Sequence, residues 1–381
     1  MINNKNYIER DIIRICAKVK YDESDLLELK ELLSYNLDWG YFLYACLHHR
    51  IIPIVYNAFE QVNGLKYIEK HVRRIMKTEC IRIKEKNTIL YNEICKINKC
   101  LQQNNLHVTN LKGAIVARLL YGELSFREFS DIDYLVEKKD IKAISDCLIS
   151  LGYVQGEYDF TSNTIREYSR KEIIKHTMNS HECSEFVMLS NSDYCRSIII
   201  DLNHQIIWNE FLKNKNKINI KEFFSNSISF DMDGFVGYHL SNEYQFVQLC
   251  SHLYSEAVYF CFDPFWARDK SDINLIKLCD IFLLIKQGLL NWDKILEIAD
   301  RMSLNEPICY TLDCIKEFYN IMLPFDPHTY FKIKSNSLIN KYLNESYEIM
   351  EWECSFEERI FDINKKVLEL RRKKIGVFAC D

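Results

Sequence analysis

The spacing of apolar residues divides the chain into two helical regions with a stretch of different character between them. Residues 7–105 have apolar positions at helical spacing, and within them residues 65–104 predict one long helix or two collinear ones. The helical spacing returns after about residue 211, most clearly at 244–257, 272–288, 293–302 and 345–373. The expected regions are an N-terminal helical region (1–105), a core (106–212) and a C-terminal helical domain (213–381).

The core region alternates short apolar runs with turns. Strands are expected at 108–111, 131–136 and 197–202, the last with the β-branched sequence SIIIDL. Helical spacing covers 114–121 and 139–151, and Gly152 follows where a helix stop is expected. Two further segments, 168–178 and 183–189, are expected to be antiparallel strands. These elements predict an α+β fold, with a mixed sheet of mostly short strands and two helices on one face.

Composition and charge narrow the class of protein. The chain has 49 Lys+Arg and 54 Asp+Glu, so its formal charge of −5 gives no electrostatic reason to expect a nucleic-acid partner. No uncharged apolar run reaches the roughly 20 residues that span a bilayer, and the charged N-terminal residues do not resemble a signal peptide. The 15 cysteines include no C-x-x-C pair, so they are expected to be buried thiols of a soluble, cytoplasmic protein with no membrane partner.

Three aspartates are the strongest candidates for chemistry. Asp131 and Asp133 are two residues apart on an expected strand, so their side chains share one face. Two carboxylates in a mostly buried strand are costly unless a positive charge lies between them, and a divalent metal is the usual solution. Asp201, near the end of another apolar strand, is the third candidate. These residues are predicted to hold one or two Mg²⁺ ions, with Mn²⁺ as an alternative.

A glycine turn precedes the acids. Lys112 and Gly113 lie where a short strand meets a helix, a junction that exposes backbone N–H groups to an anion. Lys112 and Arg127 are candidates to neutralise phosphate charge, although Arg127 could instead pair with Glu123 or Glu128. Ser130 is a further candidate contact, its alternative being a hydroxyl that bonds the local backbone of the turn. The set therefore predicts a phosphate-binding turn beside a metal site.

The order of these features carries a resemblance. A glycine turn, an Asp-x-Asp pair 131 − 113 = 18 residues later on a strand, and a single later aspartate resemble the polymerase-β-type nucleotidyltransferase superfamily. More narrowly, LKGAIVARLLYGELSFREFSDIDYLV followed by LISLGY is similar to a bacterial nucleotidyltransferase-like family with an L-K-G...L-Y-G...R...S-D-I-D-L-L-V...L-G-Y pattern. The specific part extends from Leu111 to Tyr153, while LDWGYFLYACLHHRIIPIVYNAF and LIKLCDIFLLI extend the similarity to most of the chain.

The resemblance implies a polymerase-β-type core and an NTP-dependent enzyme of the EC 2.7.7 type. Such an enzyme transfers a nucleoside monophosphate from Mg²⁺-bound NTP, ATP among them, to a hydroxyl, amine or phosphate and releases pyrophosphate. Family members resemble stand-alone enzymes of bacterial biosynthetic gene clusters, so the acceptor is expected to be a small molecule, a peptide or a protein. Asp131, Asp133 and Asp201 would be both metal ligands and catalytic groups, and Asp201 would polarise the attacking hydroxyl.

Two positions depart from the pattern, and two other functions stay open. Ala114 stands where the superfamily prefers a second glycine or a serine. Asp201-Leu202-Asn203-His204 replaces the frequent Asp-x-His-Trp, which leaves Glu185 as a reserve third carboxylate.

A metal-dependent glycosyltransferase also uses Asp-x-Asp to hold a nucleotide sugar. A degenerate nucleotide- or partner-binding accessory protein is the other alternative. The Lys-Gly turn ahead of the acids favours nucleotidyl transfer.

Several other conspicuous side chains are expected to have structural roles. Phe265 and Trp266 belong to the aromatic loop FCFDPFWARD and could stack on a base, but anchoring in the core is the favoured interpretation. His176 and His181 are expected to be packing or surface residues. Asp280 lies among apolar residues of a helix and is expected to make a structural hydrogen bond.

Overall fold

A computed structural model describes residues 7–207, 218–232, 234–259, 261, 273–334, 338–344 and 346–378. The chain forms two compact units, which we call the helical unit (residues 1–77 and 249–381) and the sheet unit (residues 78–248). Helices α5 (Lys70–Gln103) and α10 (Asn242–Tyr254) each contribute residues to both. The predicted boundary near residue 212 lies outside the described residues, as do Phe265 and Trp266.

The helical unit is assembled from the two ends of the chain. Its first segment contains α1 (Tyr7–Cys16), α2 (Glu23–Leu32), α3 (Trp39–His48), α4 (Ile52–Gln61) and the 3₁₀ turn η1 (Gly64–Tyr67). Its second segment contains the π-helical turn η4 (Ser255–Tyr259), α12 (Leu275–Lys286), α13 (Trp292–Met302), α14 (Asn305–Tyr319), α15 (Pro327–Tyr330), the 3₁₀ turn η5 (Leu338–Asn340), the hairpin strands β9 (Lys341–Leu343) and β10 (Ile349–Glu351), α16 (Phe356–Phe361) and α17 (Ile363–Phe378).

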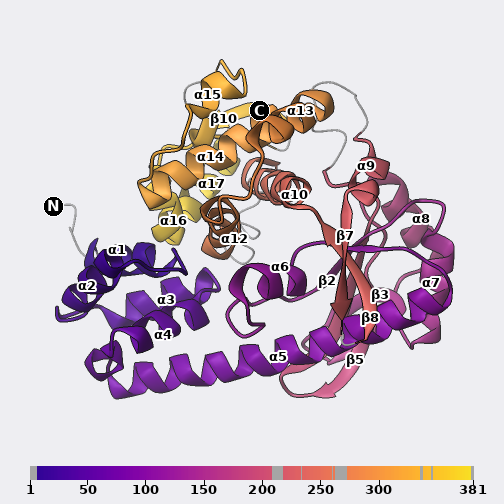
Figure 1. The fold of residues 1–381 in the computed structure, drawn as a ribbon, viewed down its shortest axis with the longest axis horizontal. Coiled ribbons are helices and arrows are strands. Elements are labelled where there is room, and N and C mark those ends of the chain that lie inside the picture. Colours follow the sequence, from indigo (N-terminus) through magenta and orange to yellow (C-terminus); the bar gives the residue numbers. More distant parts are fainter. Residues whose placement is uncertain are drawn as a thin grey trace. The chain divides into compact units, whose positions relative to one another are not determined.

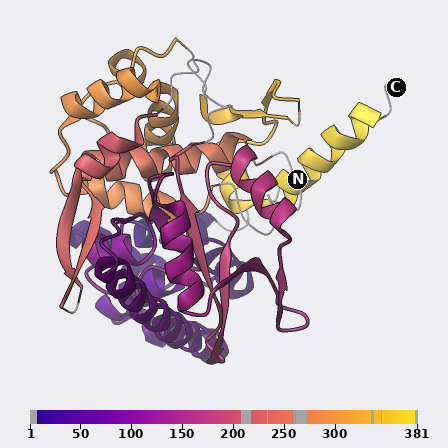
Figure 2. The ribbon, with the colours of Figure 1, turned by 90° about the vertical axis from the view of Figure 1, so that its right-hand side faces the viewer.

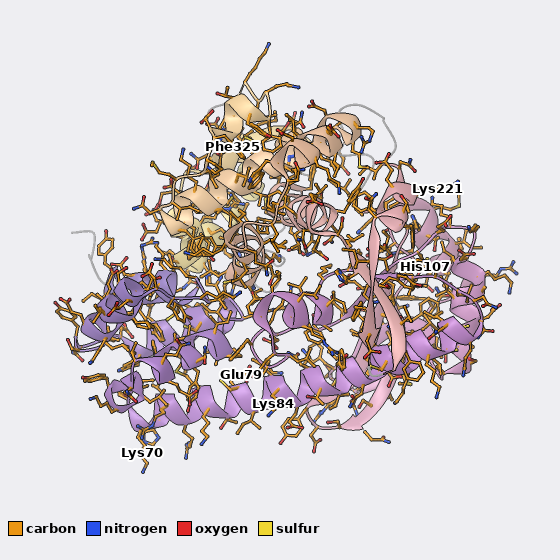
Figure 3. All side chains as sticks on the ribbon, in the orientation of Figure 1. Lys70, Glu79, Lys84, His107, Lys221 and Phe325 are labelled. Carbon is orange, nitrogen blue, oxygen red and sulfur yellow. The ribbon has the colours of Figure 1, made fainter. Side chains whose placement is uncertain are left out.

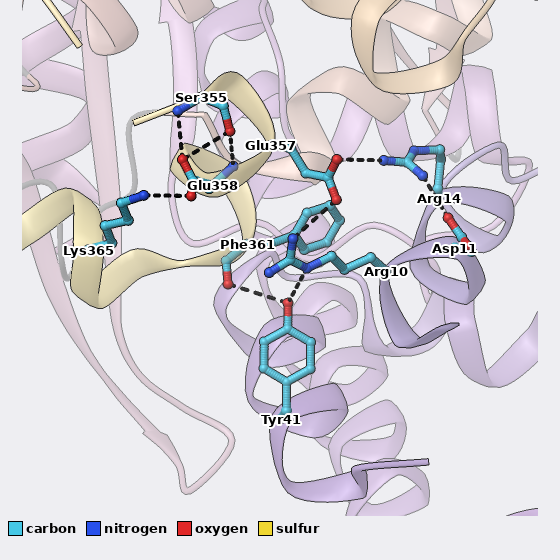
Figure 4. Close-up of polar contacts among 9 residues, drawn as sticks. All are labelled: Arg10, Asp11, Arg14, Tyr41, Ser355, Glu357, Glu358, Phe361 and Lys365. Carbon is cyan, nitrogen blue, oxygen red and sulfur yellow. Dashed lines mark hydrogen bonds and ion pairs between the residues drawn. The ribbon is translucent and has the colours of Figure 1, made fainter. Parts of the chain in front are cut away.

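Polar contacts join these two segments within the helical unit (Figure 4). Arg10 of α1 donates to the Tyr41 hydroxyl of α3 at 3.2 Å and to Glu357 of α16 at 3.1 Å. The Tyr41 hydroxyl in turn donates to the backbone carbonyl of Phe361 at 3.4 Å. Partly exposed ion pairs contribute only about 0–1 kcal/mol each. Buried apolar side chains of the helical unit, such as Ile12 of α1, therefore contribute more to its stability than these contacts do.

The sheet unit contains one eight-stranded mixed sheet, seen from two directions in Figures 1 and 2. Its strands are β1 (Thr109–Asn110), β2 (Ile132–Leu135), β3 (Val154–Asp159), β4 (Thr164–Glu167), β5 (Phe186–Ser192), β6 (Cys195–Asn203), β7 (Ser227–Met232) and β8 (Phe235–Leu240). Their order is β4-β3-β5-β6-β2-β1-β8-β7, in which β2–β6 and β1–β8 are parallel pairs and the other pairs are antiparallel. The predicted α+β class is confirmed.

The shorter helices of the sheet unit are α6 (Ala114–Val116), the π-helical turn η2 (Ala117–Tyr121), α7 (Ile141–Ser150), α8 (Arg170–Asn179) and α9 (Ile220–Ser225).

Helices α5 and α7 cover one face of the sheet. Apolar residues of α5 and α7 form one buried cluster with Ile132 and Tyr134 of β2 and with Ile200 and Leu202 of β6. Side chains alternate along a strand. The residues between these core positions, Asp133 and Asp201, therefore face the opposite side of the sheet.

Most elements predicted around the acids are confirmed. Strands β1, β2 and β6 lie within or across the predicted ranges, α7 occupies residues 141–150, and α5 is a single helix over most of residues 65–104. Gly152 follows α7 with φ of +98°, the left-handed conformation that a glycine adopts readily. Hydrophobic spacing therefore located the segments that carry the candidate site.

Three predictions of secondary structure are wrong. Residues 168–178 are mostly the helix α8, because the Ser169 hydroxyl and the Glu172 carboxylate cap its first turn reciprocally. Residues 227–240, expected in a helical region, form the β7–β8 hairpin, whose turn includes Gly234 with φ of +91°. Residues 345–373 are not one helix: β10 precedes α16, which begins at a capping box of Ser355 and Glu358.

The remaining predictions from composition concern burial and membranes. Among the described residues, 11 of 14 cysteines are buried, as expected for small apolar side chains. Within the same residues, no helix combines the length and the apolarity that crossing a bilayer requires.

Candidate active site

The parallel pairing of β2 with β6 brings the predicted acids together. In this register Asp133 lies directly opposite Asp201, and Ile132 lies opposite Ile200. Asp131 immediately precedes β2 and shares the face of Asp133. Asp133 is buried, whereas Asp131 and Asp201 are half-buried. The structure thus places the three carboxylates on adjacent strands, on the sheet face opposite α5 and α7.

Lys112 places a positive charge beside these acids. The backbone N–H of Leu111 donates to the carbonyl of Asp133 at 3.0 Å, which fixes the preceding turn beside β2. The next residue, Lys112, places its Nζ atom 3.1 Å from Oδ1 of Asp133. Burial disfavours the ammonium, but the carboxylates of Asp133, Asp131 and Asp201 outweigh it and raise the pKa of Lys112. Lys112 therefore remains charged and partly neutralises the acids.

The Asp133 carboxylate is only half satisfied by the described residues. Its Oδ1 atom accepts from Lys112 and, at 3.5 Å, from Nδ2 of Asn203. Its Oδ2 atom is buried and has no hydrogen-bond partner in the described part of the chain. Burial raises the pKa of Asp133, while Lys112 opposes that shift. An unpartnered carboxylate oxygen in a buried position is costly, and a cation would remove that cost.

Further acids increase the negative charge at this position. Burial, and then the charges of Asp133, Asp131, Glu182 and Glu185, raise the pKa of Asp201 well above its ordinary value. Glu182 lies opposite Asn203 in a β-bridge. Burial raises the pKa of Glu182 to about 7, against the opposing charge of Lys112.

The three aspartates and the two glutamates therefore gather several carboxylates near Lys112. Such a group favours a multivalent cation, because one ammonium cannot compensate all of the carboxylates when they are ionised.

The ligand atoms of the three aspartates do not form one tight group. Within the described residues, one group of at least three candidate ligands has all its ligand atoms within 4.8 Å of one another, and Asp131, Asp133 and Asp201 are not part of it. The backbone register that brings them together is present, but binding a single ion would require the side chains to close around it.

Gly113 adopts a conformation that other residues reach only with strain. Its φ is +65° and its ψ is −122°, outside the regions open to residues with a Cβ atom. A Cβ atom would lie 3.6 Å from the carbonyl oxygen of Asp131 and 3.7 Å from the Cβ atom of Phe129, which is ordinary contact. The backbone conformation, and not lack of space, therefore requires glycine. This turn begins α6, whose first N–H groups have no partner within the helix.

Arg127 and Ser130 lie just ahead of the acids. Arg127 is buried, and its backbone carbonyl accepts a hydrogen bond from Nδ2 of Asn87 at 2.8 Å. Glu128, one of its two proposed partners, pairs with Arg82 at 2.7 Å and Lys86 at 3.7 Å. Ser130 is half-buried and directly precedes Asp131. Their predicted contacts with phosphate stay predictions.

Two residues of this site, Asn203 and Glu182, were not predicted from the sequence. Asn203 is two positions after Asp201 on β6, so the alternation that paired Asp131 with Asp133 would also have placed it on the site's face. Glu182 had no comparable signal, because it precedes β5 and reaches the site through an isolated bridge.

A known protein family matches most of the chain. The profile of a family described as uncharacterised nucleotidyltransferase matches residues 35–320. Neither a curated protein nor a solved structure matches the chain. The match covers the glycine turn, the Asp-x-Asp strand and Asp201, together with parts of both helical regions. The chain belongs to this family of uncharacterised nucleotidyltransferases.

Proposed function

We propose that this nucleotidyltransferase-like protein transfers a nucleoside monophosphate from a Mg²⁺-bound NTP to an acceptor and releases pyrophosphate. The observation that carries the proposal is the pairing of Asp133 with Asp201 across parallel strands, with Oδ2 of Asp133 buried and lacking a hydrogen-bond partner among the described residues. Carboxylate oxygens on adjacent strands are the ligands that Mg²⁺ prefers. The same strand arrangement supports a polymerase-β-type core for the sheet unit.

The residues of the site have distinct roles in this proposal. Asp131, Asp133 and Asp201 would hold Mg²⁺, which would supply charge stabilisation for the transferred phosphoryl group and the departing pyrophosphate. Asp201 also orients the attacking group of the acceptor. With the cation holding Asp133, Lys112 would be available to contact phosphate oxygens.

The turn and the segment before β2 complete the donor site. The backbone of Gly113 lets a phosphate approach the start of α6 closely. Arg127 and Ser130 contribute further donors to the triphosphate. The donor is an NTP, ATP among them, and the acceptor is a hydroxyl, amine or phosphate of a small molecule, peptide or protein.

A transfer assay tests this proposal. Each of the four NTPs, labelled at the α-phosphate, is incubated with the full-length protein, Mg²⁺ and bacterial extract as a source of acceptors. We expect one NTP to give labelled acceptor and pyrophosphate, and EDTA to abolish both. The double variant Asp131→Ala/Asp133→Ala should be inactive, whereas Asp146→Ala, on the exposed face of α7, should match the wild type.

Two outcomes would overturn the proposal. Labelling that is unchanged in the double variant would remove the acids from the reaction. Release of UDP or GDP from a nucleotide sugar, with no NTP-dependent labelling, would identify glycosyl transfer instead.

A further inference from the structure

A second group of metal-binding side chains lies in the helical unit, where α15 meets α14. Cys309 and Asp313 are four residues apart on α14, so they lie on the same side of that helix. His328 of α15 places Nε2 at 2.8 Å from Oδ2 of Asp313. One ligand atom from each of the three residues lies within 4.8 Å of the other two. Thiol, carboxylate and imidazole groups therefore converge on one point.

Local structure holds the imidazole in this position. Pro327 begins α15, and the Asp326 carboxylate caps it by accepting from the backbone N–H of Thr329 at 2.8 Å. Phe325, labelled in Figure 3, stacks on Tyr330 with a centroid distance of 4.2 Å. Because both ends of this short helix are fixed, His328 has little freedom to turn away from Asp313.

The two ring nitrogens of His328 have different surroundings. Nδ1 is buried and has no hydrogen-bond partner among the described residues. A neutral imidazole has one donor and one acceptor nitrogen, and the bond to Asp313 engages only Nε2. A metal ion shared with Asp313 would bind Nε2 in place of this hydrogen bond and leave the imidazole proton on Nδ1.

Two members of the group line a cavity. Cys309 is fully buried, whereas Asp313 and His328 line a cavity of about 870 Å³. Lys316, Glu317 and Asp326 also line it. An ion held by the three side chains would thus be enclosed behind by Cys309 and accessible in front from the cavity.

We propose that Cys309, Asp313 and His328 form a zinc site that is separate from the magnesium site. A thiolate, an imidazole and a carboxylate suit Zn²⁺, whereas Mg²⁺ prefers oxygen ligands alone. Three protein ligands leave the fourth tetrahedral position open toward the cavity, for water or an anionic group. Binding breaks the S–H bond of Cys309, forms a Zn–S bond and releases the thiol proton to solvent. The ion joins α15 to α14.

Cobalt binding provides the test, because a cysteine thiolate bound to Co²⁺ gives a charge-transfer band that oxygen ligands do not give. Full-length protein freed of metal with a chelator is titrated with Co²⁺ and then with Zn²⁺. We expect the band to saturate at one equivalent of Co²⁺ and to disappear when Zn²⁺ displaces the cobalt. The acids of the sheet unit cannot give this signal, so the result is independent of the proposed nucleotidyl transfer.

Variants assign the ligands. Cys309→Ser should lose the band, whereas Cys314→Ser, at a second buried thiol of α14, should keep it. Asp313→Asn and His328→Gln should weaken Co²⁺ binding by at least ~10-fold. A wild-type protein with no band at saturating Co²⁺, or a band that persists in Cys309→Ser, would overturn the proposal. If Cys309→Ser does not fold by circular dichroism, the nearly isosteric Asp313→Asn decides, and unchanged affinity there would also overturn it.

Discussion

Half-buried Lys112 forms an ion pair with buried Asp133, with Nζ 3.1 Å from Oδ1, among the acids of the sheet unit. Only Oδ1 of Asp133 has hydrogen-bond partners among the described residues, while Oδ2 is buried without one. The lysine compensates part of the negative charge that Asp131 and Asp201 add. Lys112 therefore offsets part of the cost of the buried Asp133 carboxylate, and in the proposed function a cation would take over that role.

Replacing Lys112 should destabilise the folded protein. Lys112→Met leaves Asp133 buried without its counter-charge, and loss of one partner of a buried pair costs about 3 kcal/mol or more. We expect the free energy of unfolding, measured with urea in EDTA, to fall by that amount. Saturating Mg²⁺ should restore part of it, because a ligand that binds only the folded state stabilises that state.

The matched control is Lys139→Met, which removes an exposed lysine that pairs with Glu137 at 3.2 Å. That change should cost less than about 1 kcal/mol with or without Mg²⁺. Equal losses for the two variants, or no response of Lys112→Met to Mg²⁺, would contradict the role assigned to Lys112.

The third carboxylate of the site can be assigned by comparing two conservative variants. Asp201 faces Asp133 in the β2–β6 register, whereas Glu185 lies outside that pairing, just before β5. Asp201→Asn should therefore reduce nucleotidyl transfer by roughly 100-fold or more, and Glu185→Gln by less than about 10-fold. The measurement is the rate of pyrophosphate release at saturating NTP and Mg²⁺. The reverse order of effects would make Glu185 the ligand.

Gly113 and Gly122 allow a comparison of two strained positions in the same segment. Gly122 has φ of +80° and ψ of −21°, close to the left-handed helical region, and a Cβ atom there would meet nothing within 4 Å. Gly122→Ala should thus cost about 1 kcal/mol. Gly113→Ala should cost about 1–3 kcal/mol, since its ψ of −122° is open only to glycine. Denaturant unfolding of both variants tests this, and a smaller loss at Gly113 would contradict the observed turn.

His181 should make stability depend on pH in the acid range. Burial, together with the nearby charges of Lys112, His204 and His176, lowers the pKa of His181 to about 3. An unfolded histidine titrates near pH 6.5, so between pH 6.5 and 3 the unfolded chain binds a proton that the folded chain does not. The contribution of His181 to the free energy of unfolding is therefore fully present above pH 6.5. It falls by on the order of 3 kcal/mol as the pH decreases toward 3.

His181→Gln removes this titration, so the free energy of unfolding of the variant should vary less between pH 6.5 and 4 than that of the wild type. His71→Gln, at an exposed position of α5, should follow the wild type. Parallel curves for wild type and His181→Gln would show that the pKa of His181 is close to its ordinary value in the folded protein.

The sequence predicts the centre of the site because its chemistry is local. Asp131 and Asp133 are two residues apart, and Gly113 precedes them at a strand-to-helix junction, so alternation and turn chemistry are enough to identify them. The partner strand was also recognisable from its β-branched residues. What the sequence alone did not reveal was the register, which places Asp133 opposite Asp201.

Elements with weak hydrophobic spacing were predicted less well. Residues 168–178 read as a strand, but the capping box of Ser169 and Glu172 stabilises a helix there. The β7–β8 hairpin was not predicted, because the apolar residues of the surrounding region are spaced mainly as in helices. Glu182 reaches the site through a bridge between segments that are distant in the sequence, and no local pattern contains that information.

Mg²⁺-dependent binding of an NTP is tested most directly by the thermal unfolding midpoint of the protein. The midpoint is measured with each NTP and with UDP-sugars, in Mg²⁺ and in EDTA. A ligand that binds only the folded state raises the midpoint according to its occupancy. If the protein binds NTP at the three aspartates, at least one NTP should raise the midpoint. This increase should require Mg²⁺, be absent in Asp131→Ala and persist in Asp146→Ala. An increase with a nucleotide sugar alone, or no Mg²⁺-dependent increase with any NTP, would contradict the proposed function.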